Sequence, residues 1–453
     1  MGETATGGKS GTGTAVSPRT VAAASMAGTT LEYYDFAIFG VAAALVFPQV
    51  FFVPSDPVTG VLLSWVIFGV GYVARPLGAI IFGHLGDRVG RRAMLSWTLV
   101  LMGVSTLAIG SLPSYASIGL AAPILLAIAR ILQGIAFAGE WGGAVLLAFE
   151  HAPAKRRGFY ASFAQIGLGA GILLGYGVFA LLTGLISTEQ LLSWGWRVPF
   201  LAGGLLVVLG WLVRQRLDES PHFKKVQGAH SVARFPLIEA IRTHPRQLLL
   251  SMGAVLGFGV PSQIFFIFAV GEFAGMGIGQ SMVLSASLIG TAVLLFAPLA
   301  GAWSDRIGRR AVFIIGALLT GALGFFFFPL GERGDFVSLA LAFALLSVPF
   351  CILGGVLPSL LSDSFATRVG YSGISVGYQF GTMFASFAPA LAAGMLAGGL
   401  PLQGLVAISL AVLAVGCVCV VFLTKIIGQR GEQPVAGHEA TALPPLSESG
   451  HTH

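Results

Sequence analysis

The sequence predicts an all-α, polytopic membrane protein whose twelve transmembrane helices form two pseudo-symmetric bundles of six. Three observations predict this fold. Hydrophobic residues make up 55% of the chain and charged residues only 10%, whereas a soluble globular protein carries about 25% charged residues. One ten-residue stretch occurs twice, as GHLGDRVGRR at 83–92 and GAWSDRIGRR at 301–310. Long apolar runs also alternate with short polar segments along most of the chain.

The apolar runs predict where the helices lie. A helix that crosses a bilayer needs about 20 mostly apolar residues. Twelve segments meet this requirement, and we expect helices at 20–48, 58–83, 93–112, 119–149, 159–186, 196–214, 246–271, 281–303, 311–330, 336–361, 371–397 and 401–424.

The polar segments predict the domain organisation. Residues 1–18 are rich in Gly, Thr and Ser and hold no apolar stretch, so they predict a tail rather than a cleaved signal peptide. The only long polar segment between helices is rich in Arg, Lys and His. We therefore expect a disordered cytoplasmic tail at 1–18, a six-helix bundle at 19–214, a cytoplasmic linker at 215–245, a second six-helix bundle at 246–425, and a second disordered cytoplasmic tail at 426–453.

The basic residues predict the orientation of the helices. Of 25 Lys and Arg residues, 21 fall in the tails and in the connections on the side of the tails. Arg197 and Arg333 lie at the opposite rim, and two further arginines lie inside helices. Because basic residues favour the cytoplasmic side of a membrane, we expect both termini in the cytoplasm.

The repeated stretch predicts two related halves. Its aspartates, Asp87 and Asp305, are 305 − 87 = 218 residues apart, and each copy ends one apolar run and begins another. The stretch is too charged for lipid and too short to link two domains. It is typical of a tight aqueous hairpin between two membrane helices, and its recurrence predicts that the chain consists of two related halves.

Five charged residues of the first half fall inside predicted helices and away from the helix ends. Glu32 and Asp35 are three residues apart and therefore share a helix face. At ~1.5 Å per residue, Arg75 lies at a similar depth in the next helix, and the fourth helix carries Arg130 and Glu140. Charges in a bilayer are costly and usually functional. With three acids against two bases, one carboxylate lacks a fixed partner and is expected to bind a proton.

The predicted helices of the second half carry no ionisable residue near their centres. Glu272 and Asp363 sit at helix ends, and all eight histidines fall in loops or tails. Proton chemistry is therefore expected in the first six helices, on carboxylates.

These motifs resemble the major facilitator superfamily, which repeats GxxxDRxGRR after helices two and eight. Further stretches resemble its metabolite:H⁺ symporter family, whose members carry dicarboxylates, citrate, shikimate, proline or betaine. The stretches are GTTLEYYDF at 28–36, RPLGAIIFGHLGDR at 75–88, ARILQGIAFAGEWGGA at 129–144, WGWRVPF at 194–200, LDESPHF at 217–223 and TRVGYSGISVGYQFG at 367–381. The chain departs from that family at Thr29 and Tyr33, where Asn and Trp are usual.

The resemblance implies roles for the cytoplasmic hairpins. Asp87 and Arg91 would tie the first hairpin to neighbouring helices in one conformation, with Glu150 and Arg157 as partners. The pairs Asp305–Arg309 and Asp363–Arg368 would be their counterparts in the second half. Drug/H⁺ antiporters of the superfamily carry a Gly-Pro pair in helix five, and residues 159–186 hold none, so the resemblance implies uptake.

Two interpretations of the buried charges are open. In the first, Asp35 or Glu32 carries the coupling proton and Arg130 anchors a substrate carboxylate, which its planar fork suits. In the second, Arg75 pairs permanently with Glu32, and Arg130 with Asp35 or Glu140, only to neutralise charge. The expected site residues are Asp35, Glu32 and Glu140 for proton coupling, Arg130, Arg75, Gln133, Tyr34, Gln263, Tyr378 and Gln379 for substrate binding, and Asp87, Arg88, Arg91, Glu150, Arg157, Asp305, Arg309, Asp363 and Arg368 for gating.

The predicted function is symport of a proton with a small organic acid by alternating access. It needs no cofactor beyond H⁺ as coupling ion, no metal and no nucleic acid, and we expect a monomer in a bacterial-type cytoplasmic membrane. A proline or betaine carrier is the first alternative, although residues 429–453 lack the heptads of osmosensing members. A non-transporting membrane sensor is the second. An enzyme is not expected, because no metal cluster, nucleophile triad or GxxxxGK[ST] loop occurs.

Overall fold

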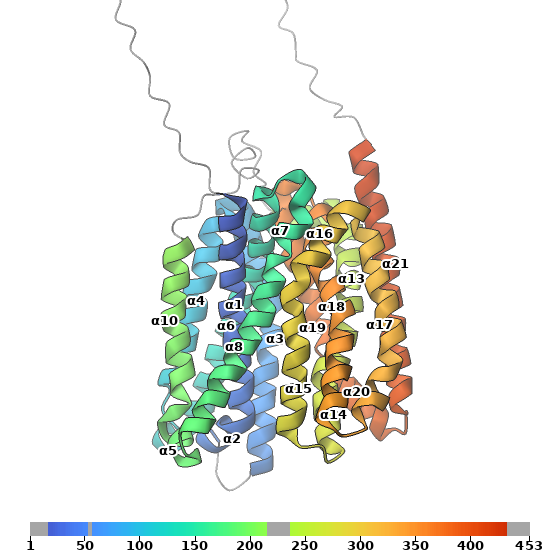
Figure 1. The fold of residues 1–453 in the computed structure, drawn as a ribbon. Coiled ribbons are helices and arrows are strands. Elements are labelled where there is room, and N and C mark those ends of the chain that lie inside the picture. The colour runs from blue at the N-terminus through green and yellow to red at the C-terminus, as the bar shows by residue number, and fades with distance from the viewer. Residues whose placement is uncertain (1–16, 53–56, 215–235, 433–453) are drawn as a thin grey trace, which may run out of the picture.

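The computed structural model of the protein describes residues 17–52, 57–214 and 236–432. Most of the two expected tails and of the linker, including 217–223, lie outside these ranges. The described chain is an all-helical bundle (Figure 1). One group of long helices comes from the first half and a second group from the second half, and the two groups stand side by side (Figure 1).

The first half contains six long helices close to their expected positions. They are α1 Pro18–Leu45, α3 Pro57–Val89, α4 Arg91–Ser111, α6 Ala121–His151, α8 Phe163–Leu185 and α10 Arg197–Arg214. Short elements connect them: α2 Phe47–Val50, α5 Tyr115–Ile118, η1 Ala154–Arg156, α7 Arg157–Ala161, α9 Thr188–Gln190 and η2 Leu191–Gly195.

The second half repeats this plan with more broken helices. Its elements are α13 Pro245–Gln263, η3 Ile264–Phe268, α14 Ala269–Gly275, α15 Gln280–Val293, η4 Leu294–Phe296, α16 Ala297–Ile307, α17 Arg309–Gly331, α18 Phe336–Ser364, η5 Thr367–Val369, α19 Gly370–Ala385, α20 Ala388–Ala397 and α21 Leu402–Glu432. The π-helical η3 follows Pro261, whose ring nitrogen cannot donate the usual helical hydrogen bond. The expected helix at 246–271 therefore continues through a change of pitch.

Ten described helical segments are long and apolar enough to cross a membrane, by length and composition alone. Two further helices, α1 and α10, lie beside them in the bundle (Figure 1), which is consistent with the twelve predicted. Glu32 and Asp35 lower the mean hydropathy of α1.

The glycine before each Arg-Arg pair explains why the repeated stretch forms a tight hairpin. Gly90 separates α3 from α4 with φ = 122°, and Gly308 separates α16 from α17 with φ = 93°. Residues with a side chain rarely adopt such positive φ values. Each glycine therefore ends one helix and starts the next at the same motif position. We call the end of the bundle that holds both hairpins the motif end; α1 begins and α21 ends there (Figure 1).

Two features differ from the expected boundaries. Residues 236–243 of the expected linker form a helix, α12 Pro236–Thr243, with Ala240 buried and Ile241 51% exposed. Apolar residues on the buried face explain why this part of a polar segment folds. The last helix, α21, runs to Glu432 rather than ending at 424, so residues 426–432 of the expected tail are helical.

The buried hydrophobic residues show where the two halves meet. The largest cluster mixes both halves, for example Trp141 and Val145 with Phe313 and Tyr371. At the opposite end the halves have separate clusters, one around Phe47 and Trp196 and another around Phe273 and Phe328. The described halves therefore share a core toward the motif end and pack independently at the other end.

Candidate functional site

A small polar pocket lies inside the first half, between α1, α3, α4 and α6. The empty space among its lining atoms is about 250 Å³. Its lining follows helical spacing, since residues three, four or seven positions apart share a face. The lining residues are Glu32, Asp35, Phe36, Gly71, Arg75, Met102, Arg130, Gln133, Gly134 and Phe137.

Asp35 lies at one end of a hydrogen-bond chain. The carboxylate is 2% exposed, and its Oδ2 accepts a hydrogen bond from the Thr106 hydroxyl at 2.6 Å. Its Oδ1 has no hydrogen-bond partner in the part of the chain that the structure describes. The side-chain amide of Gln133 donates to Thr106 at 2.8 Å, and Gln133 accepts from Arg130 at 3.1 Å. Asp35 and Arg130 are therefore joined through two uncharged side chains.

Arg130 has an aromatic environment. Its guanidinium carbon lies 4.1 Å from the ring centroid of Phe39 and 4.9 Å from that of Phe68, within the range of cation–π attraction. Gly71 leaves room for this side chain, because a Cβ there would stand 2.7 Å from the Arg130 Nε atom. Aromatic faces replace water around the charge without providing a fixed negative partner.

Arg75 occupies a similar environment on the other side of Phe36. Its guanidinium carbon lies 4.0 Å from the ring centroid of Tyr72 and 3.7 Å from that of Phe137. The ring of Phe36 is 5.5 Å from both guanidinium groups. The pocket thus places two buried cations around one aromatic ring.

Glu32 and Glu140 are also buried, at 1% and 2% exposure. Glu32 lines the pocket and a smaller neighbouring one, which Glu140 and Thr98 also line. Glu140 accepts a hydrogen bond from the Thr98 hydroxyl at 3.0 Å. Glu140 therefore lies beside the polar pocket rather than in its lining.

The other residues that were predicted to bind the substrate do not line this pocket. Tyr34 donates to the carbonyl of Pro199 at 2.9 Å, against α10. Tyr378 stacks on Trp141, with ring centroids 3.5 Å apart and an angle of 11°, and so joins α19 to α6. Gln379 is fully buried, and Gln263 is half-buried at the end of α13.

At the motif end, Asp87 joins the first half to the second. Its two carboxylate oxygens accept hydrogen bonds from the backbone N–H groups of Tyr371, at 3.1 Å, and Ser372, at 2.8 Å. Both amides belong to the first turn of α19, where unpaired N–H groups and the helix dipole favour an anion. Arg91 contacts Glu150 and donates to the carbonyl of Thr367 at 2.8 Å.

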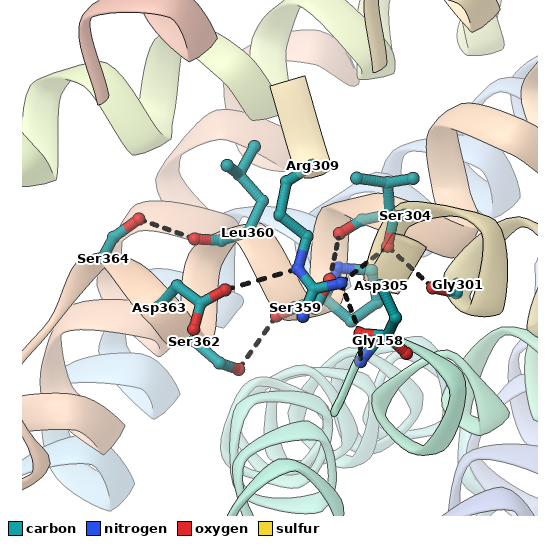
Figure 2. A network of polar contacts seen from close by, with 12 residues as sticks. Gly158, Gly301, Ser304, Asp305, Arg309, Ser359, Leu360, Ser362, Asp363 and Ser364 are labelled. Atoms are coloured by element: carbon teal, nitrogen blue, oxygen red, sulfur yellow. Dashed lines mark hydrogen bonds and ion pairs between the residues drawn. The ribbon is translucent and has the colours of Figure 1, made fainter. Parts of the chain in front are cut away.

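Asp305 makes the equivalent contact from the second half to the first. It accepts from the backbone N–H groups of Gly158, at 2.8 Å, and Phe159, at 2.9 Å, in the first turn of α7. Figure 2 shows Asp305 and Arg309 between Gly158 and Asp363. Arg309 donates to Asp305 at 2.6 Å and to Asp363 at 3.3 Å. Each motif aspartate therefore caps a helix of the other half.

Three other predicted gating arginines have different surroundings. Arg368 forms an ion pair with Glu239 of α12 at 3.1 Å. The resemblance implied that Arg368 would pair with Asp363, and this was wrong. Arg309 pairs with Asp363 instead, because it reaches that carboxylate from α17. The guanidinium carbon of Arg157 lies 4.9 Å from the Phe149 ring centroid. Arg88 is exposed.

Sequence reasoning missed the backbone amides as partners of the motif aspartates. For Asp305, the signal that was available is Gly158, whose N–H group donates to it. Gly158 lies in the first turn of α7, and a Cβ there would lie 2.5 Å from the carbonyl oxygen of Gly301. The first glycine of each motif is also in contact with the other half: a Cβ on Gly83 would lie 3.0 Å from the Ser372 Cα atom.

Replacing Gly301 by Ala is expected to open the motif end. The new Cβ would lie 2.4 Å from the carbonyl oxygen of Gly158, and overpacking of this kind costs about 1–3 kcal/mol. We expect the ratio of protein closed at the motif end to protein open there to fall about tenfold. A cysteine at the buried Ser162 should then react with a thiol reagent in a background without native cysteines. Gly321→Ala is the control, because nothing lies within 4 Å of a Cβ there. Equal labelling in the two variants would contradict this prediction.

Comparison with known proteins agrees with this architecture. The sequence profile of the Major Facilitator Superfamily matches residues 25–386. The chain is 41% identical over 390 residues to the inner membrane metabolite transport protein YhjE of Escherichia coli, covering 82% of this chain and 87% of that one. It is 38% identical to the shikimate transporter of the same organism (83% and 88% covered) and 33% identical to the proline/betaine transporter of Salmonella typhimurium (83% and 77% covered). The proton:xylose symporter XylE, bound to 6-bromo-6-deoxy-D-glucose, has the same fold, with a TM-score of 0.73 at 19% identity over 90% of this chain and 96% of that chain.

Proposed function

Because the chain belongs to the major facilitator superfamily, and within it to the metabolite:H⁺ symporter family, we propose that it imports a small organic acid together with a proton. The superfamily consists of transporters rather than enzymes. The observation that carries the proposal is the buried chain from Asp35 through Thr106 and Gln133 to Arg130. This chain supports the proposal because it joins Asp35, the proposed proton-binding group, to Arg130, the proposed carboxylate-binding group.

Arg130 is the proposed anchor for the substrate. A guanidinium remains charged at any physiological pH and offers parallel N–H donors that match a carboxylate. In the described residues, Arg130 gives one N–H to the neutral Gln133, and its Nε atom makes no hydrogen bond. A substrate carboxylate would supply the missing acceptor.

The charge of the pocket supports coupling to one proton. Glu32 and Asp35 face Arg75 and Arg130 in the lining, so the formal charges sum to zero when both acids are ionised. A proton on Asp35 raises this sum to +1, and one substrate carboxylate returns it to zero. Proton alone or substrate alone leaves a net charge in a buried site, which is unfavourable. Loaded and empty pockets are therefore the states in which the halves can move.

The movement we propose is alternating access between the two halves. In the described conformation the halves share their core and both aspartate caps at the motif end. We place this end in the cytoplasm because the basic residues gather there. Substrate and proton would enter from the opposite, extracellular end. Inward release would require Asp87 and Asp305 to leave their helix N-termini and Trp141 to separate from Tyr378. The setting would be a bacterial-type cytoplasmic membrane.

A proline or betaine carrier is the alternative, and the 33% identity to a proline/betaine transporter favours it. A zwitterion also presents a carboxylate to Arg130. It brings no net charge, however, and would leave a protonated pocket at +1. The charge balance therefore favours an acid over an osmolyte.

Transport by purified protein in liposomes tests the proposal. With an imposed inward proton gradient, we would offer labelled 2-oxoglutarate, citrate, shikimate and benzoate, with proline and betaine alongside. We expect accumulation of at least one acid, abolished by a protonophore. Accumulation of proline or betaine alone would support the alternative, and proton-independent accumulation would contradict symport.

A further inference from the structure

The hydroxyl group of Thr106 is the point at which the proton site and the anion site meet. Thr106 is fully buried on α4. Its oxygen lies 2.6 Å from the Asp35 carboxylate, 2.9 Å from the carbonyl of Met102 and 2.8 Å from the amide nitrogen of Gln133. A hydroxyl has only one proton to donate but can accept two hydrogen bonds. Its three neighbours therefore constrain where that proton points.

Arg130 determines the orientation of the Gln133 amide. A guanidinium only donates hydrogen bonds, so the Gln133 atom that faces it must be the carbonyl oxygen. The NH₂ group then faces Thr106 and donates to it. The Thr106 hydroxyl must consequently accept from Gln133, and its own proton goes either to Asp35 or to Met102.

The protonation state of Asp35 decides between these two acceptors. When Asp35 is ionised, a hydrogen bond to its carboxylate is the stronger one, because one partner is charged. When Asp35 carries a proton on Oδ2, that proton points at the Thr106 oxygen, and the Thr106 proton turns to the carbonyl of Met102. Every bond of the chain is then satisfied in both states, with a rotation of one hydroxyl.

Other groups around Asp35 cannot replace this one. The charged groups that line the pocket with it are Glu32 from α1, Arg75 from α3 and Arg130 from α6. From α4 come Thr106, which donates to Asp35, and Met102, which lines the pocket. Helix α10 presents Gly203, whose added Cβ would lie 3.0 Å from Asp35 Oδ1. No second hydroxyl or amide donor reaches the carboxylate among the described hydrogen bonds.

We propose that Thr106 is the positioning residue that couples the proton on Asp35 to the substrate anchor, by reversing its hydrogen bond with Asp35 while it continues to accept from Gln133. This inference rests on the proposed proton-coupled function and adds a residue to its mechanism. In this proposal Thr106 binds neither the substrate nor the transported proton. It acts through its hydrogen bonds with Asp35 and Gln133.

Replacement of Thr106 by Val tests the inference, because it removes the hydroxyl and keeps the shape. The ionised carboxylate loses more than the protonated one, since hydrogen bonds to charged groups are stronger. We expect the midpoint of the pH dependence of uptake to move about one unit toward higher pH. We also expect KM for the substrate to rise several-fold, because the Gln133 amide loses its acceptor. Thr106→Ser, which restores the hydroxyl, should return both values to those of the wild type.

Thr320→Val is the matched control. Thr320 is fully buried on α17 and donates to the carbonyl of Gly316 at 2.9 Å, as Thr106 does to Met102, with no carboxylate among its described hydrogen bonds. The Thr320→Val variant should keep the wild-type values of the pH midpoint of uptake and of KM. If Thr106→Val behaves like Thr320→Val, or if Ser and Val at 106 give the same shift, the inference is wrong. Thr106→Ala serves if the valine variant does not assemble. A failure of the proposed function itself appears separately, as accumulation that survives loss of the Asp35 carboxylate.

Discussion

Replacing Asp35 by Asn is expected to abolish accumulation driven by a proton gradient while exchange of labelled for unlabelled substrate continues. Asparagine resembles the protonated acid in shape and charge, so the pocket keeps a net charge of +1 and binds the anion. It cannot release a proton, so the empty carrier cannot return. Parallel accumulation and exchange assays in the same liposomes measure the two activities.

The control for this change is Asp335→Asn. Asp335 lies outside the membrane-spanning segments, and its Oδ1 accepts from the N–H of Ser338 at 2.9 Å as the N-cap of α18. Hydrogen bonds from Ser338 hold the pKa of this carboxyl below its usual range. Any stability that this cap provides is fully present above the pKa that Asp335 has in the unfolded chain. It is lost only as the pH falls through the lower pKa that Asp335 has in the folded protein. Asparagine is an equally good cap, so transport near neutral pH should not change. Undiminished accumulation in Asp35→Asn would rule out Asp35 as the proton site.

Replacing Arg130 by Lys is expected to reduce uptake about 100-fold, the range seen when one partner of a buried charged pair is truncated. Lysine keeps the charge but is a point donor that cannot both hold Gln133 and present a fork to a carboxylate. Gly71 also leaves a space shaped for the guanidinium. In uptake kinetics, the increase in KM should be larger than the decrease in the maximal rate.

Arg333→Lys is the matched control, because Arg333 is exposed between α17 and α18. If both variant proteins are monodisperse in detergent, a loss of uptake reflects a defect in transport and not in folding. If Arg130→Lys transports in proportion to the folded protein recovered, Arg130 only neutralises charge, as in the second interpretation of the buried charges.

The sequence was sufficient for the fold because its signals are local and repeated. Each apolar run is about as long as a bilayer is thick, and Gly90 and Gly308 mark the hairpins at matched positions. The similar depth of Glu32, Asp35 and Arg75 also followed from their positions along the first two helices, and the structure brings Arg130 into the same pocket lining. The positions of charged residues carry information because an apolar helix tolerates few of them.

The rest of the pocket could not be predicted because its side chains are common in any membrane helix. Phe36 and Phe39 are indistinguishable in sequence from lipid-facing phenylalanines, although they surround Arg130. Thr106 matches an ordinary buried threonine that bonds the preceding turn, and only its 2.6 Å contact with Asp35 sets it apart. The stack of Trp141 on Tyr378 likewise depends on how the two halves dock.

The most direct measurement is of proton movement caused by the substrate itself. Liposomes containing the protein and a trapped pH-sensitive dye would be held at equal pH on both sides, and the transported acid would then be added outside. For the wild type we expect acidification of the lumen that depends on substrate concentration, and for Asp35→Asn none. Substrate entry into wild-type liposomes without any change in lumenal pH would show that this protein moves its substrate without a proton.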